Sequence, residues 1–228
     1  EPGDERLRRS DDAVEEQLHF TVEARNNARF RANFADDPEI DFPALVPALC
    51  TDAVLVMAFV DGVREADLER HPEIDVRRVV SAGMRCVCRM IFSHGFVHAG
   101  IHAGNLRFFA PGRVVLLDLG LVGTLNDEDR LGVAATLFAF ASGDGRTVAR
   151  LFYEGAPYRA TPDYDAYERE VVAVVESLYR RGMGNLQITV EIGRLFDILR
   201  RHHIHARSHM TMVNLALMAA EGLGKRLA

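Results

Sequence analysis

The predicted strands of this 228-residue chain all lie before residue 118, and every segment from Asn126 onward has the pattern of a helix. Two short β-rich runs, residues 106–109 and 114–117, flank the turn Pro111-Gly112. No alternation of strands and helices follows them, so a doubly wound parallel sheet is not expected. The later helices are expected over residues 127–143, 145–154, 163–182, 188–202 and 208–227. The sequence therefore predicts an α+β fold with short antiparallel strands and a mainly helical body.

The part of the chain before residue 106 is expected to mix helices with a hairpin. A helix is expected over residues 11–34 because apolar residues recur at helical intervals, with Asp11 or Asp12 as its cap. Residues 44–60 are rich in β-forming residues and are expected to form two strands joined by a turn at Thr51-Asp52. The other expected elements are a short helix over 65–70, a helix over 75–94 that ends at Gly95, and a loop over 96–105.

Composition excludes some classes of partner. The chain has 27 Lys and Arg against 33 Asp and Glu, a net charge of -6, so no basic excess favours nucleic acid. No polybasic cluster favours an anionic membrane, and the apolar runs are too short to form a transmembrane segment. No signal peptide is visible, and three cysteines suit a reducing compartment. We expect a cytoplasmic protein, with membrane association and oligomeric state left open.

Asn105 and Asp118 are the residues that best match a known chemistry. An asparagine that ends a loop and an aspartate that precedes a glycine can both offer oxygens to Mg²⁺, which also takes phosphates and water. Protein kinases use this order: a catalytic loop H-R-D-x-x-x-x-N, then D-F-G. Here His98, Asn105 and the tripeptide at 118–120, Asp-Leu-Gly, follow the same order. The sequence predicts a metal site at Asn105 and Asp118; the alternative is a plain turn after a strand.

Several longer stretches carry a family resemblance. Residues 98–105 read HAGIHAGN, and the flanking stretches are EARNNARFRANF (23–34), VLVMAFVDGV (54–63), VVLLDLGLVGTL (114–125) and AAEGLGKRL (219–227). Together they resemble the UbiB (AarF-like) atypical kinases, whose loop typically reads HADPHPGN. The resemblance extends over essentially the whole chain from about residue 14.

This resemblance implies a protein-kinase-like fold. Residues 1–60 would form a partial small lobe with a helix, a strand hairpin and a hinge. Residues 61–228 would form the helical large lobe, with a catalytic-loop-like segment at 96–120. The implied ligands are ATP or ADP with Mg²⁺, bound weakly or not at all here. The implied role is in ubiquinone biosynthesis or other isoprenoid lipid metabolism, with lipid-biosynthesis proteins or an isoprenoid lipid as partners.

The resemblance also assigns roles to single residues. Glu23 matches the glutamate that pairs with a nucleotide-binding lysine, and that lysine would lie upstream of residue 1; alternatively Glu23 is an ordinary solvated helix residue. Met57 and Phe59 would contact the nucleotide together with Asn105 and Asp118. His98 and His102 would brace the catalytic loop; alternatively, His102 would face the cleft.

Departures from the family pattern decide the expected activity. Gly100 occupies the position of the catalytic-loop aspartate, so no side chain there can accept a proton. Loss of a general base typically costs about 10²–10⁴-fold in rate. Other departures are Gln17 and His19 at the acidic motif, Ala58 at the hinge acid, and Ile101 and Ala103 at the two prolines. We therefore expect a pseudokinase. The alternatives are an active ATPase or kinase whose lysine lobe lies outside this chain, and a helical interaction module without nucleotide binding.

Two further clusters are expected to be structural. His205 and His209 have a zinc-binding spacing if a helix begins early enough, but surface histidines in a turn between helices are the favoured interpretation. Cys86 and Cys88 should point away from each other on a helix and act as small buried residues rather than as a metal site.

Overall fold

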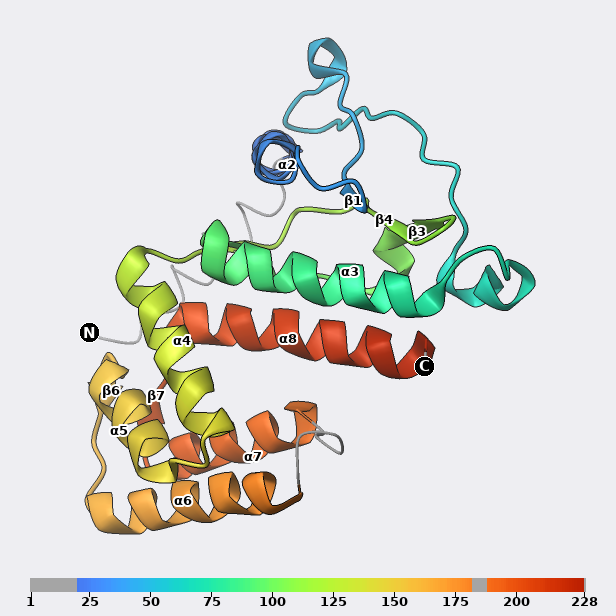
Figure 1. Ribbon diagram of the computed structural model, residues 1–228. Helices are drawn as coiled ribbons and strands as arrows, with labels where there is room; N and C mark the ends of the chain where they lie inside the picture. The colour runs from blue at the N-terminus through green and yellow to red at the C-terminus, as the bar shows by residue number, and fades with distance from the viewer. Residues whose placement is uncertain (1–19, 182–187, 228) are drawn as a thin grey trace. The chain divides into compact units, whose positions relative to one another are not determined.

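The computed structural model describes residues 20–181 and 188–227 (Figure 1). The start of the first predicted helix, its caps Asp11 and Asp12, and the positions Gln17 and His19 lie outside the described residues. The chain divides into two compact units. The first unit comprises residues 20–89, 98–122 and 222–227, and the second comprises 90–97 and 123–221. The expected lobe boundary at residue 60 stays a prediction.

A three-stranded sheet forms the centre of the first unit. Its strands are β1 (Ile40–Asp41), β3 (Leu106–Phe109) and β4 (Arg113–Leu116), in the order β1-β4-β3. The β3–β4 hairpin is antiparallel, with Leu106 opposite Leu116, and lies where the sequence predicts it. Strand β1 pairs with β4 in parallel and was not predicted, because a two-residue strand leaves no alternation to detect. The sheet packs on helix α3 (Val76–Cys88), visible beneath β4 in Figure 1.

Aromatic packing joins helix α2 (Phe20–Asn33) and the residue after it to the end of strand β1. Phe30 is fully buried and stacks on Phe42, with ring centroids 5.3 Å apart. Phe34 also contacts Phe42, at 5.6 Å. Helix α3 begins at its cap Asp75, which accepts a hydrogen bond from the Arg78 N–H. The aromatic contacts fix the helix that carries Glu23 against the residue that directly follows β1.

Two predictions of local structure were wrong. Residues 44–60 do not form two regular strands but pair only through isolated antiparallel bridges, Leu45 with Met57 and Thr51 with Val54. The cause is Pro47, which has no N–H and begins the 3₁₀ turn η1 (Pro47–Leu49). The segment 96–105 is not only a loop. It contains the buried strand β2 (Phe96–His98), which pairs with β5 (Val122–Thr124), and the 3₁₀ turn η4 (Ala103–Asn105).

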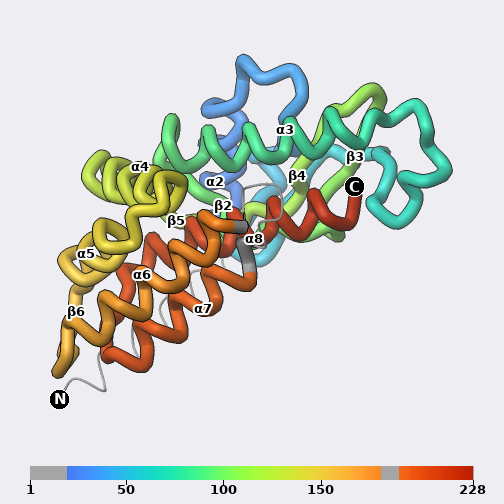
Figure 2. Tube along the Cα trace, turned by 60° about the horizontal axis from the view of Figure 1, so that its bottom comes forward, coloured from blue at the N-terminus to red at the C-terminus, as the bar shows by residue number. Residues whose placement is uncertain are grey.

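Helices make up most of the second unit, as predicted. They are α4 (Asp127–Ala141), α5 (Gly145–Gly155), α6 (Tyr164–Arg181), α7 (Ile188–Arg201) and the larger part of α8 (Ser208–Leu227). Asn126 and Asp129 form a capping box that starts α4, and Asp144 caps α5. Helix α6 lies between α5 and α7 (Figure 2). The short pair β6 (Tyr158–Arg159) and β7 (Ile204–His205) was not predicted.

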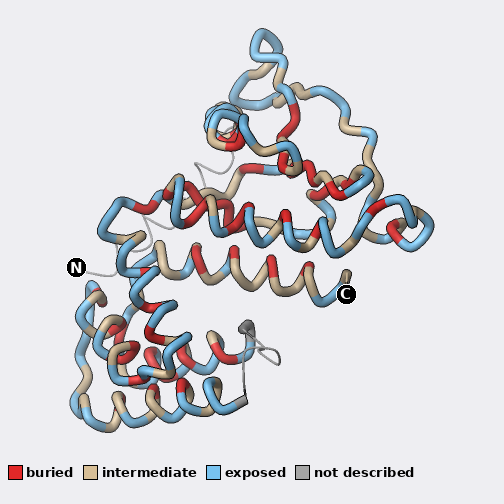
Figure 3. Tube along the Cα trace, viewed as in Figure 1, coloured by how far each residue is buried: buried red, intermediate tan, exposed pale blue. Residues whose placement is uncertain are grey.

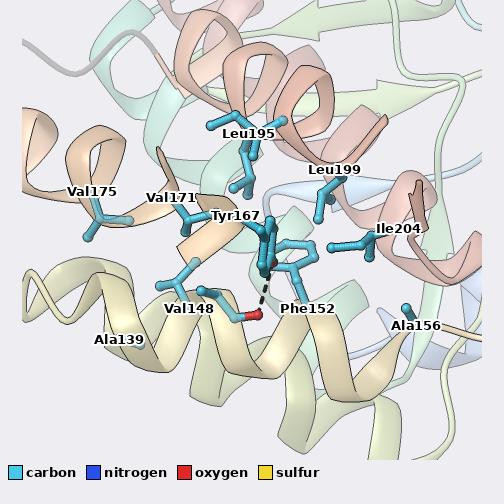
Figure 4. Packing of buried hydrophobic residues seen from close by; sticks show 12 residues of the cluster. Ala139, Val148, Phe152, Ala156, Tyr167, Val171, Val175, Leu195, Leu199 and Ile204 are labelled. Carbon is cyan, nitrogen blue, oxygen red and sulfur yellow. Dashed lines mark hydrogen bonds between the residues drawn. The ribbon is translucent and has the colours of Figure 1, made fainter. Parts of the chain in front are cut away.

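The core of the second unit lies among α5, α6 and α7. Figure 3 shows the buried residues on the facing sides of these helices. Tyr167 is fully buried at the centre, and its hydroxyl donates to the Ala149 carbonyl at 2.9 Å (Figure 4). Val171, Leu195 and Leu199 surround it. Over residues 20–181 and 188–227, no helix is both long and apolar enough to cross a membrane.

Candidate functional site

The structure brings Asn105 and Asp118 together. Asn105 directly precedes β3 and Asp118 follows β4 after one residue, so the antiparallel hairpin places both side chains at the same end. The Asn105 side-chain amide donates to Asp118 Oδ2 at 2.9 Å, and the Leu117 N–H donates to the Asn105 carbonyl at 2.8 Å. The Gly120 N–H donates to Asp118 Oδ1 at 3.0 Å. The Asp118 carboxylate is therefore held in place while the residue stays exposed.

Helix α2 holds the residue after Asp118 from two sides. Glu23 Oε1 accepts a hydrogen bond from the Leu119 N–H at 3.1 Å, and the Asn26 amide donates to the Leu119 carbonyl at 2.9 Å. The Leu119 side chain is fully buried. Burial raises the pKa of Glu23, the Leu119 N–H opposes this, and the charge of Asp118 adds to it. The Asp118 carboxylate thus lies close enough to affect the ionisation of Glu23.

His98 is buried behind the loop. Its Nδ1 lies 3.0 Å from the Leu121 carbonyl, which can only accept, so Nδ1 carries the proton. The Ala99 N–H donates to the same carbonyl at 3.0 Å. The ring lies edge-on to Phe30, and burial lowers the pKa of His98. This geometry ties the loop to residue 121 through a buried imidazole, and burial favours the neutral form of that ring.

The loop lacks a carboxylate at Gly100. A Cβ at this position would lie 3.2 Å from Cε1 of His98 and 3.5 Å from the Leu121 Cβ. A side chain there would need a small shift of the His98 ring. His102 is exposed, and its carbonyl accepts from the Asn105 N–H at 2.9 Å.

Met57 and Phe59 lie in the bridged segment 44–60. Met57 is partly buried opposite Leu45, whereas the Phe59 side chain is 89% exposed. Their assignment to the nucleotide stays a prediction. Sequence reasoning missed Asn26, which lies three residues after Glu23 and so on the same face of α2.

The donor set at Asn105 and Asp118 suits magnesium better than zinc. Among the residues that the structure describes, no group of three or more His, Cys, Asp or Glu could hold a metal ion. Magnesium needs only one or two carboxylates when phosphates and water complete its shell. An exposed carboxylate beside an amide oxygen therefore fits a Mg²⁺–nucleotide.

The histidine cluster is not a zinc site. His205 lies in β7, before α8 begins, so it shares no helical face with His209. The His209 Nδ1 lies 3.3 Å from Asp129 Oδ1, and the His202 Nε2 lies 3.1 Å from Glu170 Oε1. Sequence reasoning missed these two acidic partners because they lie far away along the chain.

The two neighbouring cysteines differ in burial. Cys86 is buried as expected, and burial raises the pKa of its thiol. Cys88 is exposed, so the expectation of burial was wrong for it. It follows that the helix turns the two thiols to opposite sides, as expected from their spacing.

Comparison with known proteins identifies the family. The model of the ABC1 atypical kinase-like domain matches residues 4–152, and that of the UbiB helical domain matches residues 171–228. Two proteins named "Probable protein kinase UbiB", from Haemophilus ducreyi and Actinobacillus pleuropneumoniae serotype 7, are each 27% identical over 93% of this chain. The chain spans 40% of the length of each of these relatives.

A solved structure agrees on the fold. Rv3197 of Mycobacterium tuberculosis, solved in complex with erythromycin, has a TM-score of 0.59 and 15% identity over 93% of this chain and 55% of its own. The predicted α+β, kinase-like fold is thereby confirmed. Because one family model covers more than half of the sequence, the chain belongs to the ABC1 atypical kinase-like family.

Proposed function

We propose that the protein is a pseudokinase that binds ADP or ATP with Mg²⁺ at Asn105 and Asp118 and transfers phosphoryl groups poorly or not at all. The observation that carries the proposal is the contact between these two side chains, at 2.9 Å, in a loop that has glycine at position 100. The metal-binding half of a kinase site is thus retained without the proton acceptor.

Three residues of the first unit would share the work of binding. Asp118 would supply the negative charge that a hard cation needs, and Asn105 an amide oxygen. Glu23 would act through Leu119, because its carboxylate accepts a hydrogen bond from the Leu119 N–H. This contact would fix the direction of the neighbouring Asp118 carboxylate. When bound, Mg²⁺ would neutralise charge on the nucleotide phosphates.

Poor catalysis is expected because the loop has no side chain that can replace the carboxylate missing at position 100. His98 is buried, and its Nδ1 is engaged with the Leu121 carbonyl, so it does not substitute for the missing carboxylate. Loss of the base costs about 10²–10⁴-fold in rate, whereas binding of the nucleotide relies on positioning and on charge neutralisation by the cation. The protein can therefore still bind a nucleotide after it has lost phosphoryl transfer.

A role in ubiquinone or other isoprenoid lipid metabolism is the part of the proposal that family resemblance supports. Under it, lipid-biosynthesis proteins or an isoprenoid lipid would be the partners, and membrane association would occur through them. Copurifying quinone or prenyl lipid, detected by mass spectrometry, would support this part.

Asp118→Asn is expected to weaken Mg²⁺-dependent ADP binding by at least about tenfold, because it removes the charge and keeps the shape. Asn105→Ala should weaken it less, since an amide carries no net charge. Calorimetric titration with ADP, with Mg²⁺ and with chelator, measures both. Asp165→Asn, at an exposed aspartate in the first turn of α6, is the matched control and should change nothing. Binding that ignores both chelator and Asp118→Asn would favour the interaction-module alternative.

Gly100→Asp alone is expected to restore no phosphoryl transfer. The new Cβ would press on the buried His98 ring at 3.2 Å, and groups that act as a unit gain little from one repair. Turnover of radiolabelled ATP by the variant and the parent chain measures this, with Gly100→Asp/Asp118→Asn as the control. Robust turnover that Asp118→Asn abolishes would contradict the prediction.

An active ATPase or kinase is the second candidate, and one observation favours it. Glu23 uses Oε1 for the Leu119 N–H, and its Oε2 accepts no hydrogen bond from the residues that the structure describes. That free oxygen could receive a lysine from outside this chain. Turnover by the full-length protein but not by this chain would favour this candidate.

A further inference from the structure

A cavity of about 460 Å³ lies in the second unit, and neither Asn105 nor Asp118 is among its lining residues. It is open to solvent on one side and is lined by the start of α4, the end of α5 and the segment that enters α8. Its size falls within the range of small-molecule sites, about 300–1,000 Å³. Its apolar walls are Leu131, Ala135, Leu151, Phe152, Ala206 and Met210. The cavity therefore has the size and lining to take the apolar body of a small ligand.

Two glycines keep this space open. Gly132 lies inside α4 and Gly155 ends α5, and a Cβ added at either would meet no atom within 4 Å. Neither has the positive φ that would require glycine. Glycine is also the poorest helix former after proline, so α4 is less stable with Gly132 than with alanine. A side chain at position 132 would therefore extend from α4 into the open space that Gly132 lines.

The basic groups at the cavity are already engaged. Arg207 donates through Nε to the Gly155 carbonyl at 2.7 Å and lies 3.5 Å from Asp129 Oδ1. The Nδ1 of His209 lies 3.3 Å from the same oxygen. Burial lowers the pKa of His209, the charge of Asp129 opposes this, and the charge of Arg207 adds to the lowering.

The acidic groups at the cavity are in excess. The carboxylate of Glu154 makes no hydrogen bond or ion pair within the described part of the chain, and Glu128 reaches only Arg207, at 3.9 Å. Three carboxylates, including Asp129, therefore face one guanidinium. An apolar cavity with an unbalanced negative rim complements a cation and repels an anion.

We propose that this cavity binds a small amphipathic cation. The apolar body of the ligand lies against Leu151 and Phe152, and its ammonium group faces Glu154. Asp129, Arg207 and His209 form the fixed polar wall, since they are satisfied by one another. The proposal does not depend on nucleotide binding, because every residue that lines the cavity belongs to the second unit.

Three probes of equal shape test the charge preference on the whole chain: 4-phenylbutylamine, 4-phenylbutanol and 4-phenylbutyrate. We expect the amine to bind at least about tenfold more tightly than the carboxylate, with the alcohol between them, by calorimetry or ligand-observed NMR. Added salt should reduce the difference, because the rim is exposed. Glu154→Gln should bring the amine close to the alcohol.

Gly132→Leu tests the location of the site. The new side chain fills the cavity, so amine binding should fall at least about tenfold, while a better helix former leaves the fold intact by circular dichroism. Gly193→Leu is the matched control, since Gly193 lies inside α7, its Cβ would also meet no atom within 4 Å, and it does not line the cavity. Gly132→Ala provides a milder variant should leucine disturb folding.

Three results would each overturn the proposal. One is that no probe binds, which would mean that the cavity accommodates a protein segment and not a small molecule. Another is that the carboxylate binds as tightly as the amine. The third is that Gly132→Leu and Gly193→Leu affect binding equally.

Discussion

Phe30→Ala is expected to lower the free energy of unfolding of the first unit by about 3–5 kcal/mol, the usual cost of emptying a phenylalanine site in a core. Phe30 is fully buried, stacks on Phe42 at 5.3 Å and meets the edge of His98. Phe30 lies on the same helix as Glu23, so removal of the Phe30 ring should also weaken the hydrogen bond between Glu23 and the Leu119 N–H. Hydrogen exchange in urea, followed at the amides of β3 and β4, separates this unit from the helical one.

The matched control for this change is Phe138→Ala. Phe138 also lies inside a helix, α4, but its side chain is 75% exposed. Its replacement should change stability by no more than about 0.5 kcal/mol. Equal losses from the two variants would mean that the packing of Phe30 is not what holds α2 to the sheet.

Asp37→Asn is the second large expected effect, with a loss of about 2–3 kcal/mol. The Asp37 carboxylate is only 3% exposed, accepts from the Glu39 N–H at 3.0 Å, and lies 3.1 Å from Arg89 and 3.5 Å from Arg85. Breaking a fully buried pair costs about 3–5 kcal/mol, and the partly exposed arginines reduce this figure. Chemical denaturation measures the loss. Asp41→Asn, at a half-exposed carboxylate with ion pairs of 3.6 and 3.9 Å, should cost less than about 1 kcal/mol.

The same carboxylate predicts how stability depends on pH. Burial disfavours ionisation of Asp37, but the Glu39 N–H, Arg85 and Arg89 outweigh it, so the pKa is lowered. Hydrogen bonds from Arg78 and Arg85 likewise lower the pKa of Glu39. A lowered pKa gives stability that is present above the unfolded value, about 4, and is lost as pH falls through the folded value. The free energy of unfolding of the parent chain should therefore decrease as the pH is lowered below about 4. In Asp37→Asn this decrease with falling pH should be smaller.

The elements that could be predicted from sequence are those with local signals. The helices after residue 126 were found because Asn126 and Asp144 mark their starts and the apolar spacing is helical. The hairpin of β3 and β4 was found because a turn separates two β-rich runs. Strand β1 was missed because its partner β4 is more than seventy residues away, and pairing over that distance leaves no trace in a two-residue run.

The candidate site also contains residues that could be predicted from sequence and residues that could not. Asn105 and Asp118 were identified from their order and spacing, and the hairpin between them explains why they meet. The contribution of Asn26 could not be read from the sequence, because it depends on how α2 packs on Leu119. The acidic partners of His202 and His209 were missed for the same reason: helices distant in sequence supply them.

The first unit is assembled from chain segments that are far apart, and this has a consequence for folding kinetics. Glu23 and Leu119 are 96 residues apart, and Glu65 accepts a hydrogen bond from Arg226, 161 residues later, at 2.6 Å. Closing such long loops costs entropy before any contact repays it, whereas neighbouring helices such as α5 and α6 meet through short connections. The helical unit can therefore form early, whereas the hydrogen bonds of Glu23 and Asn26 with Leu119 form only with the slow, long-range docking of α2.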